Sequence, residues 1–324
     1  MRKIEEIKSK LSPESIRSEL DNMMSVPLPQ NIQKWVDEYV KAGGVRSNII
    51  WPFTYCVIKN VSPFVDYDKS YEKDVEEAKF LFSMFVVIID DIADLKKDSE
   101  LLEEIYKAIS NDNYLGRENL DTLSTFALDI FRHINKKIAN FPFYSDFKNI
   151  LSFEIDQIFN SMRFAILVSS HPFLISAENY WTYFPCSMQM MLYNIMELMA
   201  GNGRLTPKEL KEIRDIILKA QKMGRIGNWI STWEREIDEK DLTSLIFAYA
   251  LDSNILDVDN LEAISSEELI AKIKRDRLEE KLMNVWDECY KDISGKKDIK
   301  DLIEIRELGQ KLEKLLILQI VSKS

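Results

Sequence analysis

The sequence is poor in the residues that end helices and build tight turns. Only nine of its 324 residues are glycine and nine are proline, whereas glycine alone averages about 7% of protein sequences. A fold made of many short strands needs frequent turn residues, and no segment alternates cleanly between apolar and polar residues. These shortages argue against a β-rich fold and predict long helices.

Cysteine and long apolar runs are also scarce. The three cysteines, Cys56, Cys186 and Cys289, form neither a disulfide framework nor a spaced metal motif. We therefore expect a reducing, cytoplasmic location. No apolar run approaches the roughly 20 residues that cross a bilayer, and the first residues contain no apolar signal core. The sequence thus predicts no stable insertion into a membrane.

Basic residues are outnumbered by acidic ones, and the net charge is −11. A general nucleic-acid binder is usually basic, so we expect no nucleic-acid partner. Hydrophobic residues make up 46% of the chain, which suffices for a sizeable core. We find no linker and no repeat, and we predict one all-α domain over residues 1–324.

Helix-start signals occur along the whole chain. Ser12 precedes a proline and is typical of an N-cap. Thr206 also precedes a proline, and Glu209 completes a capping box. The amphipathic pattern over residues 265–293 predicts one long helix.

An apolar helix is predicted to end in a cluster of acidic residues in the segment FLFSMFVVIIDDIADLKKD, residues 80–98. Asp90 and Asp94 are one helical turn apart and share a face, with Asp91 at its edge. Carboxylates repel each other at this spacing and oppose the dipole of a helix C-terminus. Paired carboxylates are good ligands for Mg²⁺. The alternative is a helix that simply leaves the core for solvent.

A second segment, GRIGNWISTWEREIDEKD, residues 224–241, carries further oxygen donors. Asn228, Thr232 and Glu236 recur every four residues and so project from one stripe of a helix. Interleaved tryptophans predict that this helix is largely buried, and buried polar groups need partners. Amide, hydroxyl and carboxylate oxygens suit Mg²⁺, and the flanking Arg225 and Arg235 suit diphosphate, which a guanidinium binds through two hydrogen bonds.

These two segments resemble the metal-binding motifs of class I terpene synthases. DDIAD is similar to the aspartate-rich motif, and NWISTWERE is similar to the second metal motif. The resemblance implies a single-domain helical bundle of microbial type around a central apolar cavity. It implies three Mg²⁺ ions held by Asp90, Asp91, Asp94, Asn228, Thr232 and Glu236, and diphosphate contacts from Arg225 and Arg235.

The implied substrate is a linear isoprenyl diphosphate, either C20 geranylgeranyl or C15 farnesyl. The residues of the second motif resemble those of bacterial diterpene cyclases more than those of sesquiterpene cyclases. Loss of diphosphate leaves a carbocation, which needs a dry pocket and is stabilised by aromatic faces. The candidate pocket residues are Phe82, Phe85, Trp181, Tyr183, Phe184 and Trp229. The alternative for each is ordinary core packing, which is common for aromatic residues at helical spacing.

Two features of many microbial members are missing. Phe184 stands near the place where those members carry a diphosphate-sensing arginine, and the C-terminal sequence KLLILQIVSKS lacks their Arg-Tyr pair. Arg163 or Lys222 are candidates to replace them. Many relatives are dimers, so a homodimer stays an open alternative.

Two other functions compete with a cyclase. Chain-elongating prenyltransferases share the fold but carry two aspartate-rich motifs, whereas this chain has one Asp-Asp pair, at 90–91. A non-catalytic helical interaction protein would show no Mg²⁺ requirement.

Overall fold

The computed structural model describes residues 2–47, 49–111, 114, 120–257, 264–299 and 302–322. Over these residues the regular structure is helical, and the only extended pairing is an isolated bridge between Ile299 and Ile303. The predicted all-α fold class is therefore confirmed. None of the described helices combines the length and the apolar character that a membrane span requires.

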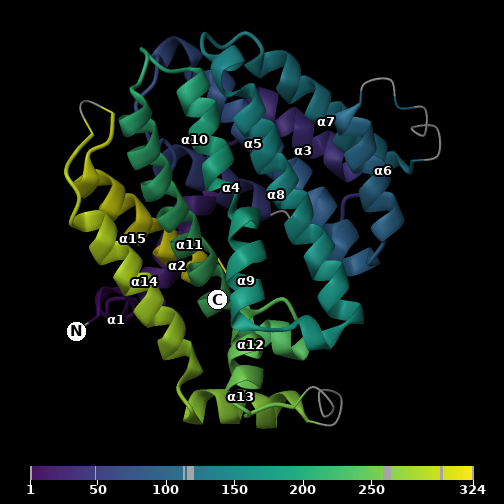
Figure 1. Cartoon of the computed structure of the whole chain (residues 1–324), viewed down its shortest axis with the longest axis vertical. Coiled ribbons are helices and arrows are strands. Elements are labelled where there is room, and N and C mark those ends of the chain that lie inside the picture. Colours follow the sequence, from purple (N-terminus) through teal and green to yellow (C-terminus); the bar gives the residue numbers. More distant parts are fainter. Residues whose placement is uncertain are drawn as a thin grey trace.

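The helices follow one another through the whole chain (Figure 1). The first half contains α1 (Lys3–Ser9), α2 (Pro13–Met24), α3 (Gln30–Lys41), α4 (Ile50–Asn60), η1 (Lys69–Tyr71), α5 (Glu72–Asp91), η2 (Ile92–Lys96), α6 (Ser99–Ser110) and α7 (Thr122–Ile138). The second half contains α8 (Tyr144–Ser170), η4 (Pro172–Leu174), α9 (Ala177–Tyr183), η5 (Phe184–Met188), α10 (Met190–Met199), α11 (Pro207–Asp238), α12 (Leu245–Asp252), α13 (Ser266–Arg275), α14 (Leu278–Ser294) and α15 (Ile305–Val321).

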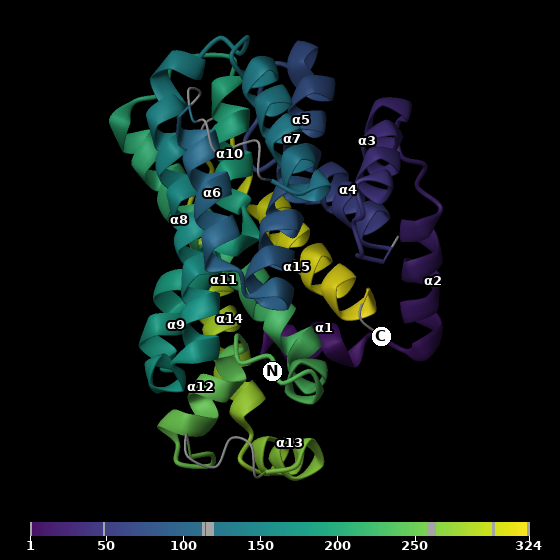
Figure 2. The ribbon, with the colours of Figure 1, turned by 90° about the vertical axis from the view of Figure 1, so that its right-hand side faces the viewer.

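Helix α10 connects the two helices that carry the predicted motifs. It packs against α5, α8 and α11, while α5 packs on its other side against α7. Helix α11 in turn packs against α14 and α15. Figure 1 shows α12 and α13 at one end of the molecule, and Figure 2 shows α2 and α3 as an outer layer along one side. The buried side chains form one contiguous core.

The predicted helix starts at Ser12 and Thr206 are confirmed. The Ser12 hydroxyl accepts a hydrogen bond from the Ser15 amide at 3.2 Å. The Thr206 hydroxyl accepts from the Glu209 amide at 3.3 Å, and the Glu209 carboxylate accepts from the Thr206 amide at 2.7 Å. Each side chain therefore satisfies an amide that has no partner within its own helix.

The prediction of one long helix over residues 265–293 is wrong. Two helices, α13 and α14, occupy this range, and they are separated at Arg277, whose φ is +55°. The buried residues explain the break. Leu269 and Ile273 are four residues apart, but the next buried residue is Leu278, five residues on. A straight helix would turn Leu278 away from the core, and the break restores its burial.

A buried ion pair fastens α5 to α10. Lys79 of α5 is 1% exposed and pairs with Glu197 of α10, which is 0% exposed. The Glu197 carboxylate also accepts hydrogen bonds from the Ser62 hydroxyl and the amides of Phe64 and Val65, each at 3.0 Å. The Lys79 ammonium donates a second hydrogen bond to the Ser62 hydroxyl at 2.7 Å. This network ties α5, α10 and the α4–α5 connection together, three turns before Asp90.

Candidate functional site

The acidic residues lie where α5 stops being a regular helix. The α-helix ends at Asp91, and residues 92–96 continue in the wider π-helical turn η2. Lys97 then takes a left-handed conformation with a φ of +51°. Asp91 is buried, while Asp90 has 37% of its side chain exposed. Asp94 therefore lies in a wide turn and not in the regular helix that the sequence predicts. Such turns are often found at functional sites.

Arg46, from the connection between α3 and α4, lies directly on this acidic segment. Its Nε donates a hydrogen bond to Oδ1 of Asp91 at 2.5 Å, and its Nη2 donates to Oδ2 of Asp90 at 3.0 Å. One guanidinium therefore bridges both carboxylates. The sequence analysis missed this residue, because no periodic pattern links position 46 to positions 90 and 91.

The backbone around Arg46 is built to hold it there. After α3, Gly43 adopts a φ of +91°, which glycine tolerates best. A side chain on Gly44 would have its Cβ only 2.1 Å from the ring of Tyr39. The Arg46 amide donates to the Tyr39 hydroxyl at 3.2 Å, and the Tyr39 ring is fully buried and packs edge-on against Trp51. The Gly43–Gly44 pair thus lets the chain turn tightly over Tyr39.

The three residues of the second predicted motif lie on one stripe of α11, as the sequence predicts. Thr232 and Glu236 are buried, and Asn228 is partly exposed. The Thr232 hydroxyl donates to the Asn228 carbonyl at 2.7 Å. The Arg225 Nη1 donates to the Asn228 side-chain oxygen at 3.3 Å. Arg225 and three oxygen donors therefore line one side of α11.

The charges of the two segments act on each other. Burial raises the pKa of Asp90, the charge of Arg46 lowers it, and Arg225 lowers it from the side of α11. Burial also raises the pKa of Asp94 well above its usual range, and the negative charge of Asp90 raises it further. Arg225 again acts in the opposite direction. The fold therefore brings the acidic end of α5 and the Arg225 side of α11 into one electrostatic environment.

Asp241 is a second residue that the sequence analysis missed. Helix α11 ends at Asp238, and Lys240 turns the chain with a φ of +55°. The Asp241 amide then donates back to the Glu236 carbonyl at 2.8 Å, as at many helix C-termini. The charge of Asp241 raises the pKa of both Asp90 and Asp94. The available signal was a third acidic residue after the motif, following Asp238 and Glu239, but its place depends on the turn at Lys240.

Two solved structures with a similar fold are terpene synthases. Abietadiene synthase from Abies grandis matches with a TM-score of 0.66 and 14% identity, over 96% of this chain and 38% of that chain. This chain has the class I terpene synthase fold. Isoprene synthase from grey poplar leaves (Populus x canescens), solved in complex with three Mg²⁺ ions and dimethylallyl-S-thiolodiphosphate, matches with a TM-score of 0.62 and 16% identity, over 94% of this chain and 54% of that chain.

The chain spans 54% of the isoprene synthase chain and 38% of the abietadiene synthase chain. No protein-family model matches the sequence, and no curated protein does so either. The likeness therefore establishes the fold alone.

Within this terpene synthase fold, three of the predicted aromatic residues gather beside Arg225. Its guanidinium carbon lies 4.9 Å from the ring centroid of Trp229 and 5.4 Å from that of Phe184. Trp181 packs edge-on against Trp229 at 5.5 Å. These rings already stabilise a cation at this place, and their role in a substrate pocket stays a prediction.

The other predicted aromatic residues pack differently. Phe82 and Phe85 are buried and contact Phe131 of α7, at centroid distances of 6.4 and 5.4 Å. Tyr183 stacks on Phe164 of α8 at 4.5 Å. These contacts are those of core packing, and a second role as pocket walls stays a prediction.

The remaining basic candidates are not equivalent. Arg163 is held by Glu103, to which its Nε and Nη2 donate at 2.5 and 2.9 Å. Arg235 is 60% exposed and pairs with Glu239 at 3.5 Å. The Lys222 ammonium lies 4.0 Å from the ring centroid of Trp181. Arg225 and Arg46 are therefore the arginines that the structure places around the acidic segment.

Carboxylates alone do not form a closed metal cage. Among the described residues, no three Asp, Glu, His or Cys side chains converge closely enough to hold a metal ion. The donor set of the two motifs also includes the amide of Asn228 and the hydroxyl of Thr232.

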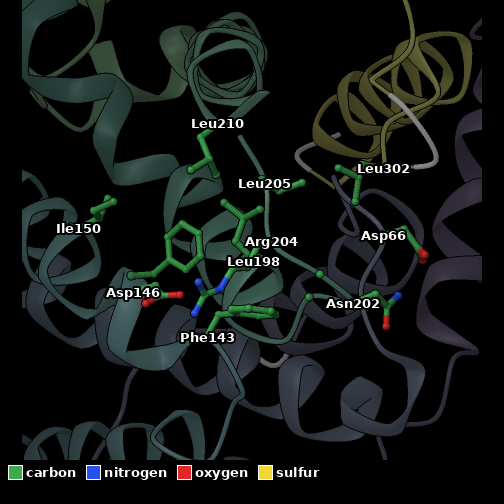
Figure 3. Close-up of a pocket in the computed structure, with 13 residues that line it drawn as sticks. Asp66, Phe143, Asp146, Ile150, Leu198, Asn202, Arg204, Leu205, Leu210 and Leu302 are labelled. Atoms are coloured by element: carbon green, nitrogen blue, oxygen red, sulfur yellow. The ribbon is translucent and has the colours of Figure 1, made fainter. Parts of the chain in front are cut away.

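A separate pocket of about 310 Å³ lies at the other end of α11. Figure 3 shows Phe143, Asp146 and Arg204 together in its wall, with Leu210 from the first turn of α11. Leu210 precedes Asn228 by 18 residues, which is about 27 Å along a helix. This pocket is therefore distinct from the site between the two motifs.

Proposed function

We propose that this chain is a Mg²⁺-dependent class I terpene cyclase that ionises a linear C20 or C15 isoprenyl diphosphate. The supporting observation is the shared electrostatic environment of Asp90, Asp94 and Arg225 within a terpene synthase fold. The two segments that resemble metal motifs are 138 residues apart, counted from Asp90 to Asn228, and the charge of Arg225 beside the second segment lowers the pKa of Asp90 and Asp94 in the first.

The donor set fits Mg²⁺. All six predicted ligands offer oxygen atoms, which this hard cation prefers. Burial and neighbouring negative charge raise the pKa of Asp90 and Asp94, so their charge is poorly compensated in the protein alone. In addition, Oδ2 of Asp91 is buried and has no hydrogen-bond partner among the described residues. A nearby cation would stabilise these carboxylates.

In this proposal Asp90, with Asp91 and Asp94, and the α11 stripe of Asn228, Thr232 and Glu236 hold the metal ions. Three ions are expected, as in the isoprene synthase structure. Bound Mg²⁺ would act as a Lewis acid that stabilises charge on the departing diphosphate. Arg225 orients the diphosphate from the side of α11, and Arg235 is the second basic residue assigned to it.

The substrate's allylic C–O bond breaks, and its electron pair leaves with the diphosphate. The hydrocarbon cation that remains must be shielded from water until it cyclises and loses a proton. The rings of Trp181, Phe184 and Trp229 are the candidates to stabilise it, at about 0.5–2 kcal/mol for each well-placed ring.

We further propose that the chain acts as a single domain in the cytoplasm. Its three cysteines are unpaired, as is usual in a reducing compartment. A homodimer is compatible with the fold.

The test is incubation of the purified protein with C10, C15 and C20 diphosphates and Mg²⁺, followed by gas chromatography of the extracted hydrocarbons. We expect a hydrocarbon and free diphosphate from the C20 or the C15 substrate. Adding the C5 co-substrate isopentenyl diphosphate tests chain elongation, which would yield longer diphosphates. Absence of any product or diphosphate release from all substrates would reject an enzyme of this class.

Two variants test the assigned ligands. Asp90→Ala and Asn228→Ala should each lower kcat/KM at least about a hundredfold, because metal-assisted charge stabilisation contributes several kcal/mol. Their helicity by circular dichroism should be unchanged. Asp129→Ala is the matched control, since Asp129 is 56% exposed on α7. Full activity in either ligand variant would remove that residue from the metal site.

A further inference from the structure

Arg46 already occupies the position of a cation on the acidic segment. Its planar guanidinium joins Oδ1 of Asp91 and Oδ2 of Asp90 through two separate nitrogens. Among the described residues, no other side chain donates a hydrogen bond to either carboxylate. The charge of Asp94 also acts on Arg46 and raises its pKa. One arginine is thus hydrogen-bonded to two aspartates of the motif and interacts electrostatically with the third.

The backbone around Arg46 helps to fix the position of its guanidinium. The Arg46 amide is hydrogen-bonded to the buried Tyr39 hydroxyl. The preceding Gly44 lies so close to the Tyr39 ring that a methyl group would not fit. About two thirds of the Arg46 side chain is buried. The α3–α4 connection therefore holds the Arg46 guanidinium in place on the acidic segment, although Arg46 precedes Asp90 by 44 residues.

The geometry points to a stand-in role: Arg46 is an internal counter-cation that holds Asp90 and Asp91 in the metal-free protein and competes with Mg²⁺ for them. This inference rests on the proposed function only in taking Asp90 as a metal ligand. It makes Arg46 a positioning residue, since it acts through the carboxylates.

The competition follows from charge. When Mg²⁺ binds Asp90, either the guanidinium leaves Oδ2 or two cations share one carboxylate. Charges about 5 Å apart near a protein surface still interact appreciably, although salt weakens the effect. Removing the positive charge of Arg46 should therefore strengthen Mg²⁺ binding, while the metal-free protein loses the partner of a buried carboxylate. A residue that only stabilised the fold would produce the second effect without the first.

The experiment compares Arg46→Gln with the wild-type chain, both stripped of metal, in calorimetric titrations with Mg²⁺ alone. We expect the variant to bind Mg²⁺ on the order of tenfold more tightly and to melt at a lower temperature without metal. Saturating Mg²⁺ should close most of that gap in melting temperature. Arg46→Lys keeps the charge and should bind Mg²⁺ nearly as the wild type does.

Arg132→Gln is the matched control. Arg132 is exposed on α7 and, among the described residues, pairs with Asp129 alone, three residues away, so this variant removes the same group without touching the acidic segment. Its Mg²⁺ affinity should equal that of the wild type.

Equal or weaker Mg²⁺ binding by Arg46→Gln overturns the inference, and so does a lack of measurable binding by both proteins. If Arg46→Gln does not fold, the wild-type chain is treated with phenylglyoxal and its arginines are followed by peptide mapping. Arg46 should react slowly without metal and faster with Mg²⁺, and an unchanged rate would again overturn it. Failure of the proposed function is distinguishable, since it appears as a lack of turnover whatever the affinity for Mg²⁺.

Discussion

In the buried pair Lys79–Glu197, we expect the two partners to differ in how much stability is lost when each is replaced. Glu197 keeps three hydrogen bonds when Lys79 is removed, from the Ser62 hydroxyl and the amides of Phe64 and Val65. When Gln replaces Glu197, Lys79 keeps its bond to the Ser62 hydroxyl but loses its only oppositely charged partner among the described residues. An uncompensated buried charge typically costs 3–5 kcal/mol, roughly, whereas hydrogen bonds to a charged group each return about 1.5–3 kcal/mol.

We therefore expect Glu197→Gln to lower the free energy of unfolding by about 3–5 kcal/mol, and Lys79→Met by only about 1–3 kcal/mol. The first loss is a large part of the roughly 5–15 kcal/mol that stabilises a typical protein. Both are measured by urea unfolding, followed by circular dichroism at 222 nm. The double variant should be more stable than Glu197→Gln alone, because it contains no unpaired ammonium.

The pH dependence of the stability of Glu197→Gln is a second test. Burial lowers the pKa of Lys79 from its usual value of 10.5, and loss of Glu197 lowers it further. In the window between that lowered pKa and 10.5 the unfolded chain binds more protons than the folded one, so stability rises with pH. The variant should regain stability from pH 7 toward pH 10 more than the wild type does. Equal losses in both single variants, or a double variant whose loss is the sum of the two, would refute this account of the network.

Two further predictions concern local features. Gly44→Ala should cost about 1–3 kcal/mol of stability, because its Cβ would meet the buried Tyr39 ring at 2.1 Å. Gly203→Ala, which has open space around its Cβ, should leave the melting temperature unchanged, and similar losses in both variants would contradict the packing argument. Burial raises the pKa of the Cys186 thiol from 9.0 to about 11. At pH 8 its thiolate fraction, and so its rate with a disulfide reagent, should be about a hundredfold below that of an ordinary thiol. A rapid reaction in the folded protein, matching that in urea, would show that this half-buried thiol is more exposed than in the structure.

Much of the molecule is readable from short-range patterns. The shortage of glycine and proline predicts the all-α fold, and the N-cap at Ser12 and the capping box at Thr206 mark where α2 and α11 begin. The stripe of Asn228, Thr232 and Glu236 follows from the period of a helix, and this period can be counted along the chain. The break at Arg277 is not readable in this way, because the shift from a spacing of four to a spacing of five residues lies in the side chains that the structure buries.

The sequence alone determined the helical fold class, the starts of α2 and α11 and the polar stripe of α11, because helical periodicity and capping act over a few neighbouring residues. Only the tertiary structure decided which faces meet. Arg46 binds Asp90 from 44 residues away, Lys79 pairs with Glu197 at a separation of 118 residues, and the charge of Asp241, which follows the turn at Lys240, raises the pKa of Asp90 and Asp94. Such partners share no period with the residues that they contact. Their pairing depends on how whole helices pack, and charge then fixes what each partner does.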